Sequence, residues 1–272
     1  MKIDTEKCIG CGECIKECFI GAIKLNDDKA IIDKRRCILC GHCIAVCPIN
    51  AAYSDEYDMN EVKEYSEKDF NIDSETLLNF IKFRRSIRRF TDKEVEEEKL
   101  LKIIEAGRFT QTAGNQQDVL YILVRKKIST LRDMTIKNLK NLGDKILSDS
   151  QNSNPIFKKY AKMWLKMYED HKIDPVANDR LFFNAPAVLI VAAGIQVNAD
   201  LASSNMELMA DSLGLGSMFS GFFIRACTDN KEIYDFLKVP EGKMIYTCMT
   251  LGYPDVKYLR TVPRKKPNIL NM

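Results

Sequence analysis

The chain has 272 residues, about two domains' worth at roughly 150 residues per domain, and this length allows a sizeable core. Hydrophobic residues make up 46% and charged residues 29%, a balance typical of globular proteins that argues against disordered and collagen-like chains. The net charge of +3 is too small to predict a nucleic-acid partner.

The longest apolar run, residues 185–195, is shorter than the roughly 18 residues of a membrane-spanning helix. The opening residues are charged and do not form a secretory signal. We therefore expect a cytoplasmic protein without a membrane partner. Eight of the 10 cysteines precede Pro48, and in a reducing compartment such a cluster favours metal binding over disulfides.

The first 50 residues contain an internal repeat, in which the spacing CxxCxxCxxxC occurs twice. Thiolates bind the iron of iron–sulfur clusters, and in this spacing the last cysteine of each copy binds the other cluster. The sequence therefore predicts two 4Fe-4S clusters. One is held by Cys8, Cys11, Cys14 and Cys47, and the other by Cys37, Cys40, Cys43 and Cys18.

These cysteines resemble those of the bacterial ferredoxins with two 4Fe-4S clusters, over roughly the first 55 residues. The alternative is structural zinc, whose sites use paired CxxC or Cys/His sets instead of two complete copies of this run. The proline that follows the fourth cysteine in the family is present as Pro48 and is replaced by Phe19 after Cys18, which removes no ligand. His42 has no assigned role, because eight cysteines already fill both clusters.

After the cysteines, residues 52–73 are polar and acidic and have no sustained apolar repeat, which is typical of a linker or a short irregular helix. We therefore divide the chain into a two-cluster domain at residues 1–55, a linker at residues 56–73 and a second domain at residues 74–272.

In the second domain, predicted strands alternate with predicted helices. Ser74 can cap a first helix, and Thr91 with Glu94 forms a capping-box pattern before a second helix. Short runs rich in branched residues predict strands, and start and stop signals predict two later helices. The strands are predicted at residues 119–124, 187–193 and 243–251, and the helices at residues 200–213 and 229–238.

Residues 128–180 contain no clear strand. Asn154 and Pro155 open a helix that carries aromatic and methionine side chains at helical spacing. We interpret this region as an inserted helical lid, with the stripe of large side chains as core or lid.

Several short motifs of the second domain are typical of ligand binding. Residues 84–90 read RRSIRRF, and guanidinium groups beside a hydroxyl can bind a phosphate. The alternative is a solvated charged face that nearby glutamates neutralise. The other motifs are TAGNQQ at residues 112–117, LGLGS at 213–217, SGF at 220–222, LGYP at 251–254 and PRKK at 263–266.

Taken together, these motifs resemble the nitroreductase family of FMN enzymes, over about residues 74–272. The resemblance implies an α+β fold, an α/β sandwich with a mostly antiparallel sheet flanked by helices. It also implies a homodimer through the FMN domain, with FMN in clefts at the subunit interface.

The resemblance assigns FMN contacts position by position. Arg84, Arg85, Ser86 and Arg88 match the segment that contacts the phosphate and ribityl chain, and Arg264 and Lys266 match a C-terminal cationic pair. Thr112, Asn115 and Gln117 match the segment that reaches flavin from the partner subunit, and Ser220 and Gly221 match residues whose backbone amides lie near flavin N5. Asp118 stands where the family often has proline.

We therefore expect an FMN-dependent oxidoreductase in which two 4Fe-4S clusters deliver single electrons and flavin reduces a small organic acceptor. The resemblance implies a nitroaromatic or quinone-like acceptor, and an enone or halogenated phenol is a competing choice. The donor is reduced ferredoxin or NAD(P)H, and no GxGxxG follows a strand. No side-chain nucleophile or triad is assigned. The second hypothesis is an electron-transfer flavo-iron–sulfur protein that passes electrons to a partner protein.

Overall fold

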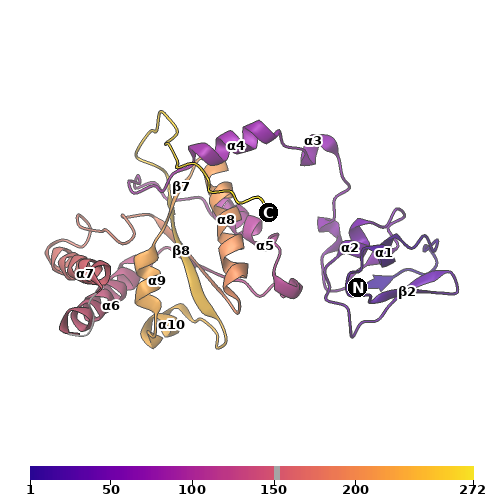
Figure 1. The fold of residues 1–272 in the computed structure, drawn as a ribbon, viewed down its shortest axis with the longest axis horizontal. Helices are drawn as coiled ribbons and strands as arrows, with labels where there is room; N and C mark the ends of the chain where they lie inside the picture. The colour runs from indigo at the N-terminus through magenta and orange to yellow at the C-terminus, as the bar shows by residue number, and fades with distance from the viewer. Residues whose placement is uncertain (150–153) are drawn as a thin grey trace. The chain divides into compact units, whose positions relative to one another are not determined.

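The computed structural model describes residues 1–149 and 154–272, and this part of the chain forms two compact units (Figure 1). The first unit contains Met1–Asp73 together with the short segment Gly114–Gln116. The second contains Ser74–Ala113 and Gln117–Met272. Each unit has a hydrophobic core of its own.

The first unit consists of two similar halves, in agreement with the repeated cysteine spacing. A short helix follows a left-handed glycine in each half, Gly12 with φ of 79° and Gly41 with φ of 80°. Residues other than glycine rarely adopt this backbone conformation, which explains the glycine after the second cysteine of each copy. The elements are β1 (Lys2–Ile3), α1 (Glu13–Lys16), β2 (Ile23–Asn26), β3 (Lys29–Ile32), α2 (His42–Ala45) and β4 (Ala52–Tyr53). Strand β1 pairs antiparallel with β4, and β2 pairs antiparallel with β3.

Two short helices lie in the segment that the sequence predicts as a linker. They are the 3-10 helix η1 (Met59–Glu61) and the helix α3 (Glu67–Phe70). The Asp58 side chain caps the first by accepting from the amide of Asn60, and the Ser66 side chain caps the second by accepting from the amide of Asp69.

A four-stranded antiparallel sheet forms the centre of the second unit, and its strand order is β5-β6-β8-β7. The strands are β5 (Leu120–Val124), β6 (Ala187–Ala193), β7 (Gly216–Phe219) and β8 (Met244–Gly252). Every residue of β6 is buried, because helices cover both faces of the sheet at this central strand. This explains why β6 has a continuous apolar sequence without alternation. The antiparallel sheet confirms the predicted α+β class.

Helices cover the two faces of the sheet in separate layers (Figure 1). Helices α5 (Glu97–Arg108) and α8 (Gln196–Ser212) contribute to the core that contains Leu189 and Val191 of β6. The opposite core contains Val188 and Ile190. The helices of that layer are α6 (Ile128–Ser148), α7 (Pro155–Ile173), α9 (Gly221–Cys227) and α10 (Lys231–Leu237).

The predicted lid region forms two helices, α6 and α7, which pack against each other. Asn154 caps α7 as expected, by accepting from the amide of Ile156. Trp164 and Met167 are buried in the core, whereas Tyr160 is 40% exposed. The inner half of the stripe is therefore core. Residues 150–153 of the predicted lid lie outside the described residues.

The helix α4 (Ser74–Phe83) begins one residue earlier than predicted, with Ser74 as its first residue and not as its cap, and the predicted capping box of Thr91 and Glu94 is wrong. Helix α5 begins at Glu97, and its N-cap residue, Glu96, makes no side-chain cap. The amide of Thr91 donates to the carbonyl of Tyr253 over 2.9 Å, and its hydroxyl accepts from the amide of Lys93 over 3.4 Å, but no helix follows before Glu97.

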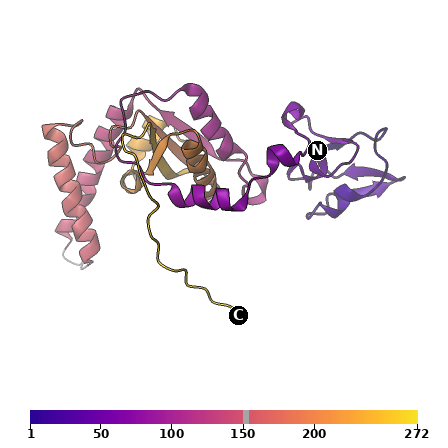
Figure 2. The same ribbon diagram turned by 90° about the horizontal axis from the view of Figure 1, so that it is seen from above.

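No described helix is both long and apolar enough to cross a membrane. The C-terminal residues 261–272 have neither helix nor strand and run away from the sheet as an extended segment (Figure 2).

Candidate functional site

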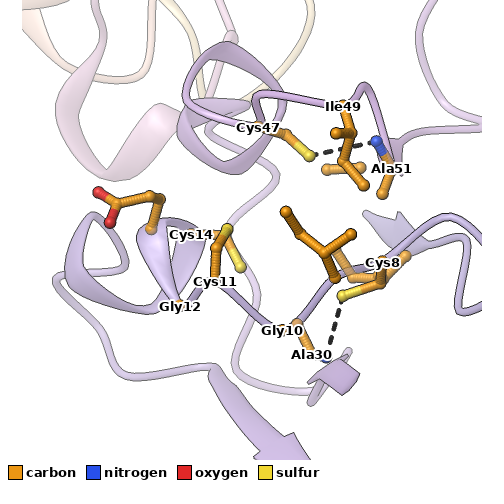
Figure 3. A pocket seen from close by; sticks show the side chains of 13 residues that line it. Cys8, Gly10, Cys11, Gly12, Cys14, Ala30, Cys47, Ile49 and Ala51 are labelled. Atoms are coloured by element: carbon orange, nitrogen blue, oxygen red, sulfur yellow. Dashed lines mark hydrogen bonds between the residues drawn. The ribbon is translucent and has the colours of Figure 1, made fainter. Parts of the chain in front are cut away.

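In the first unit, one cavity is lined by cysteines from both copies of the repeat. Figure 3 shows Cys8, Cys11, Cys14 and Cys47 around this space. The amide of Ala51 donates to the Cys47 sulfur over 3.1 Å, and the amide of Ala30 points at the Cys8 sulfur over 3.4 Å. Such N–H···S contacts stabilise negative charge on a cluster ligand. The structure thus brings together the four thiols that the spacing predicts for the first cluster.

A second cavity is lined by the other predicted set, Cys18, Cys37, Cys40 and Cys43, and also by Cys14. Here the amide of Ala22 donates to the Cys18 sulfur over 3.2 Å. This bond is the counterpart of the one between Ala51 and Cys47, since each alanine lies four residues after the last cysteine of its copy. The internal repeat therefore extends to the hydrogen bonds of the sulfur atoms.

The thiols surround cavities instead of converging on a point. Among the described residues, no group of three His, Cys, Asp or Glu side chains is arranged to hold a single metal ion. Burial and the neighbouring thiols of Cys40 and Cys37 raise the pKa of Cys43 to about 11. For Cys47, burial is outweighed by backbone N–H groups, such as that of Ala51, which lower its pKa. Two sets of four sulfur donors are the ligands that iron–sulfur clusters require.

The second unit contains a basic cavity of about 680 Å³. Its volume lies in the range of roughly 300 to 1,000 Å³ of small-molecule sites. All five of its charged lining residues are basic, and none of the lining residues is acidic. The lining residues are Ile81, Lys82, Arg84, Arg85, Ser86, Arg88, Tyr258, Thr261, Val262 and Arg264.

Close packing on β7 positions the RRSIRRF segment at this cavity. The amide of Ile87 donates to the carbonyl of Ser217 over 2.8 Å, and Ser86 forms an isolated bridge with the same residue. The Ile87 side chain is buried against Gly216, where a Cβ would lie 2.5 Å from the Ile87 Cγ1. The second glycine of LGLGS is therefore required for the close approach of the two segments.

Several guanidinium donors at the cavity are buried without a partner among the described residues. They are Nε of Arg84 and both Nε and Nη2 of Arg85. The remaining contacts of these groups hold them in place, because Arg84 Nη1 pairs with Glu207 and Arg85 Nη1 donates to the carbonyl of Lys82 over 2.9 Å. Buried donors without partners are costly, and a phosphate group satisfies several guanidinium donors at once. The residues present therefore fit the phosphate of FMN.

The structure divides the predicted TAGNQQ contacts between the two units. In the second unit, the Thr112 hydroxyl accepts a hydrogen bond of 2.9 Å from the amide of Gln117. Asn115 belongs to the first unit, where its side chain donates to the carbonyls of Ile38 and Leu39 over 2.9 Å each. Contact of these three residues with flavin stays a prediction.

Asp118 anchors the chain directly after this motif. Its carboxylate accepts a hydrogen bond of 2.7 Å from the amide of Gly194 and one of 2.9 Å from the Asn198 side chain. Burial alone would raise the pKa of Asp118, but these bonds and the charge of Lys243 lower it. The acidic residue thus has a structural role at the position where the family often has proline.

Of the two amides predicted near flavin N5, one is already occupied. The amide of Ser220 donates to the carbonyl of Cys248 over 2.8 Å, and its hydroxyl donates to the carbonyl of Leu181 over 3.1 Å. The Ser220 amide is thus already used within the chain, and the position of Ser220 near flavin N5 stays a prediction. Gly221, the first residue of α9, remains the candidate.

The C-terminal cationic pair is also divided. Arg264 lines the basic cavity, whereas Lys266 is exposed and is not among the lining residues.

An acidic pair beside this cavity was not identified from the sequence. Glu207 and Asp211 of α8 lie one helical turn apart at the Arg84 guanidinium, and their spacing of four residues, which places two carboxylates on one helix face, is the signal that could have revealed them.

Comparisons with known proteins agree with both units. Residues 81–253 match the family model described as the nitroreductase family, and residues 7–51 match the model of a 4Fe-4S dicluster domain. The second match favours iron–sulfur clusters over the zinc alternative.

Two curated relatives share the name "Putative NADH dehydrogenase/NAD(P)H nitroreductase". The protein of Archaeoglobus fulgidus is 27% identical over 180 residues, which cover 66% of this chain and 86% of the relative. The protein of Methanothermobacter thermautotrophicus is 26% identical over 188 residues, which cover 65% of this chain and 77% of the relative.

Two solved structures show the same fold, and both are described as a nitroreductase with bound FMN. The Bacteroides fragilis protein has a TM-score of 0.54 and 22% identity, and the match covers 72% of this chain and 98% of that one. The Desulfitobacterium hafniense protein has a TM-score of 0.51 and 21% identity, with coverage of 71% and 97%. Since the nitroreductase model spans more than half of the sequence, this chain belongs to the nitroreductase family and carries a 4Fe-4S dicluster domain at residues 7–51.

Proposed function

We propose that the protein is an FMN-dependent oxidoreductase that reduces a small organic acceptor, nitroaromatic or quinone-like, with electrons delivered through two 4Fe-4S clusters. The observation that carries this proposal is the basic cavity, whose buried Arg84 and Arg85 donors have no partner among the described residues. The two cavities lined by four or more cysteines add the electron-delivery part.

The names of similar proteins support the cofactor and the reaction class. The two solved structures with the same fold are described with bound FMN, and both curated relatives are named as NAD(P)H nitroreductases. FMN, when bound, accepts electrons singly and transfers them in pairs, which suits a chain that also carries one-electron clusters.

Each part of the site has a defined task in this proposal. The guanidinium groups of Arg84, Arg85, Arg88 and Arg264 bind the FMN phosphate, and the Ser86 hydroxyl contacts it or the ribityl chain. Gly221 offers its amide to the flavin ring, and Thr112 and Gln117 reach flavin in the partner subunit. The protein supplies binding and electrostatics, and no side chain acts as a nucleophile.

Helix α4 supports the proposed homodimer. None of its residues is buried, although it carries five large apolar side chains. Four of them are 37% to 46% exposed in the single chain, namely Leu77, Leu78, Ile81 and Phe83. A second subunit would cover such a helix, and the flavin sites of the two subunits would then lie at the interface.

The electron donor is reduced ferredoxin or NAD(P)H. The clusters favour ferredoxin, because 4Fe-4S clusters exchange single electrons with other iron–sulfur proteins at potentials that reach about −700 mV. A second candidate function, transfer of electrons to a partner protein without reduction of a small molecule, is favoured by the complete set of cluster ligands.

The test is anaerobic purification of the full chain, followed by quantification of FMN, iron and sulfide and by turnover assays. The proposal predicts one FMN and eight iron atoms per chain, and rapid reduction of nitroaromatics or quinones. Slow reduction of all small acceptors with fast reduction of a co-purified protein would support the second candidate. Absence of FMN would reject both.

A further inference from the structure

An acidic pair lies directly behind the basic cavity. Glu207 and Asp211 are four residues apart on α8, so their side chains lie on the same face of the helix. Glu207 is only 6% exposed, and it forms an ion pair with Nη1 of Arg84, which lines the cavity. The Arg84 guanidinium is therefore in contact with a buried carboxylate and also forms part of the cavity wall.

Some polar atoms around the Arg84 guanidinium have no hydrogen-bond partner in the described part of the chain. Arg84 Nε and Asp211 Oδ2 are buried and have no hydrogen-bond partner among the described residues, whereas the Ser217 hydroxyl lies beside the Glu207 carboxylate. Burial raises the pKa of Glu207, and the charge of Arg84 opposes this change. The charge of Arg84 therefore favours the ionised form of the buried Glu207 carboxylate.

We propose that Glu207 is a positioning residue for FMN: its carboxylate fixes one end of the Arg84 guanidinium, so that the exposed part of this side chain stays in the wall of the basic cavity and binds the phosphate group there. This inference rests on the proposed function, because it concerns the cofactor assigned there. Without Glu207, Arg84 Nη1 loses its partner and the side chain no longer has a fixed place in the cavity wall.

The experiment uses the full chain with its clusters and with flavin removed, and measures dissociation constants from the quenching of flavin fluorescence. Riboflavin, which lacks the phosphate, serves as the second probe. The variants are Glu207→Gln and Arg84→Ala, alone and together. The control is Asp200→Asn, an exposed carboxylate at another position of α8.

We expect Glu207→Gln to weaken FMN binding about tenfold, as the loss of a charge-assisted hydrogen bond does, and to leave riboflavin binding unchanged. In the Arg84→Ala background, Glu207→Gln should have no further effect, because Glu207 acts through Arg84. Unchanged or tighter FMN binding would overturn the inference. Equal weakening of both flavins would also overturn it, because such a result indicates a general structural role.

Inorganic phosphate separates this inference from the proposed function. If the unaltered protein binds no FMN, the proposed function fails. Thermal stabilisation by phosphate then tests whether Glu207 positions Arg84 for a phosphate group. Stabilisation of the unaltered protein and of Asp200→Asn, but not of Glu207→Gln, supports the positioning role. Equal stabilisation of all three proteins, or of none, contradicts it.

Discussion

The Asn115 side chain donates a hydrogen bond of 2.9 Å to the carbonyl oxygen of Leu39, inside the first unit. Leu39 lies between Cys37 and Cys40 and has a φ of 58°, and its carbonyl also accepts a 2.8 Å bond from the Tyr57 hydroxyl. A residue predicted to contact flavin therefore fixes the loop that carries two ligands of the second cluster.

Replacement of Asn115 by alanine should loosen this loop. The variant loses two hydrogen bonds, to Ile38 and Leu39, each worth roughly 1 kcal/mol. We expect half of the iron to be released about tenfold faster in the presence of a chelator, and the other half at the original rate. The control is Asn26→Ala, whose side chain is exposed on the β2–β3 hairpin. Equal iron release from Asn115→Ala and the control would contradict the prediction.

Single cysteine substitutions test the crossed ligand sets. Cys47→Ser should remove the first cluster, and Cys18→Ser the second, so that each variant retains about half of the iron. Cys47→Ser combined with Cys11→Ser should lose no more iron than Cys47→Ser alone, whereas Cys47→Ser combined with Cys18→Ser should lose both clusters. Iron analysis and electron paramagnetic resonance report the outcome. Cys227→Ser, at a buried thiol of the second unit, is the control.

Substitution of Gly216 by alanine should displace the cavity wall. The new Cβ would lie 2.5 Å from Ile87 Cγ1 and 2.8 Å from Ile87 Cβ, and such overpacking costs about 1–3 kcal/mol. We expect lower stability and weaker FMN binding, because Ile87 carries the neighbouring Ser86 and Arg88 with it. The additional change Ile87→Ala removes the clash and should restore part of the FMN affinity. No recovery in the double variant would show that Gly216 acts by another route.

Titration of Asp211 should lower the free energy of unfolding as the pH rises. Burial and the charge of Glu207 together raise the pKa of Asp211 to about 6, although Arg84 opposes them, whereas an unfolded Asp titrates near 3.9. As the pH rises from about 4 to 6, the unfolded state releases its proton first, so the free energy of unfolding falls. Asp211→Asn cannot titrate, and we expect it to be more stable than the unaltered protein at pH 7.5.

The expected gain is about 1 kcal/mol after solvent screening of this half-buried group, and it should disappear at pH 4. Trp164, the single tryptophan, is buried in the second unit, so its fluorescence during urea unfolding reports on this unit alone. Asp200→Asn is again the matched control. A gain that is the same at both pH values would show that Asp211 does not titrate in this range.

Local sequence patterns predicted the elements that are long or that carry a clear cap. The predicted bounds of β6 match the structure, and α7 begins at Pro155 with Asn154 as its cap. Strands β1 and β4, of two residues each, are too short for any periodic pattern. The capping box at Thr91 was wrong by about one and a half turns, since α5 begins at Glu97, while the Thr91 amide pairs with Tyr253, 162 positions along the chain.

The candidate site shows the same limit. Spacing alone was enough to group the eight cysteines, because each set consists of the first three cysteines of one copy and the last cysteine of the other. The partners of Arg84 and Asn115 could not be predicted, since Glu207 and Leu39 are distant in sequence. Helix α6 lies in the region predicted as a helical lid, but its bounds were not predicted, because its polar residues hide the apolar stripe that contains Leu131 and Leu139.

Anaerobic reduction of bound flavin by reduced ferredoxin tests the central claim most directly. The account predicts fast flavin bleaching in the unaltered protein and a loss of at least about 100-fold in the rate when both Cys18→Ser and Cys47→Ser are present, with FMN content unchanged. Equally fast bleaching in the cluster-deficient protein, or a protein that contains no flavin, would contradict it.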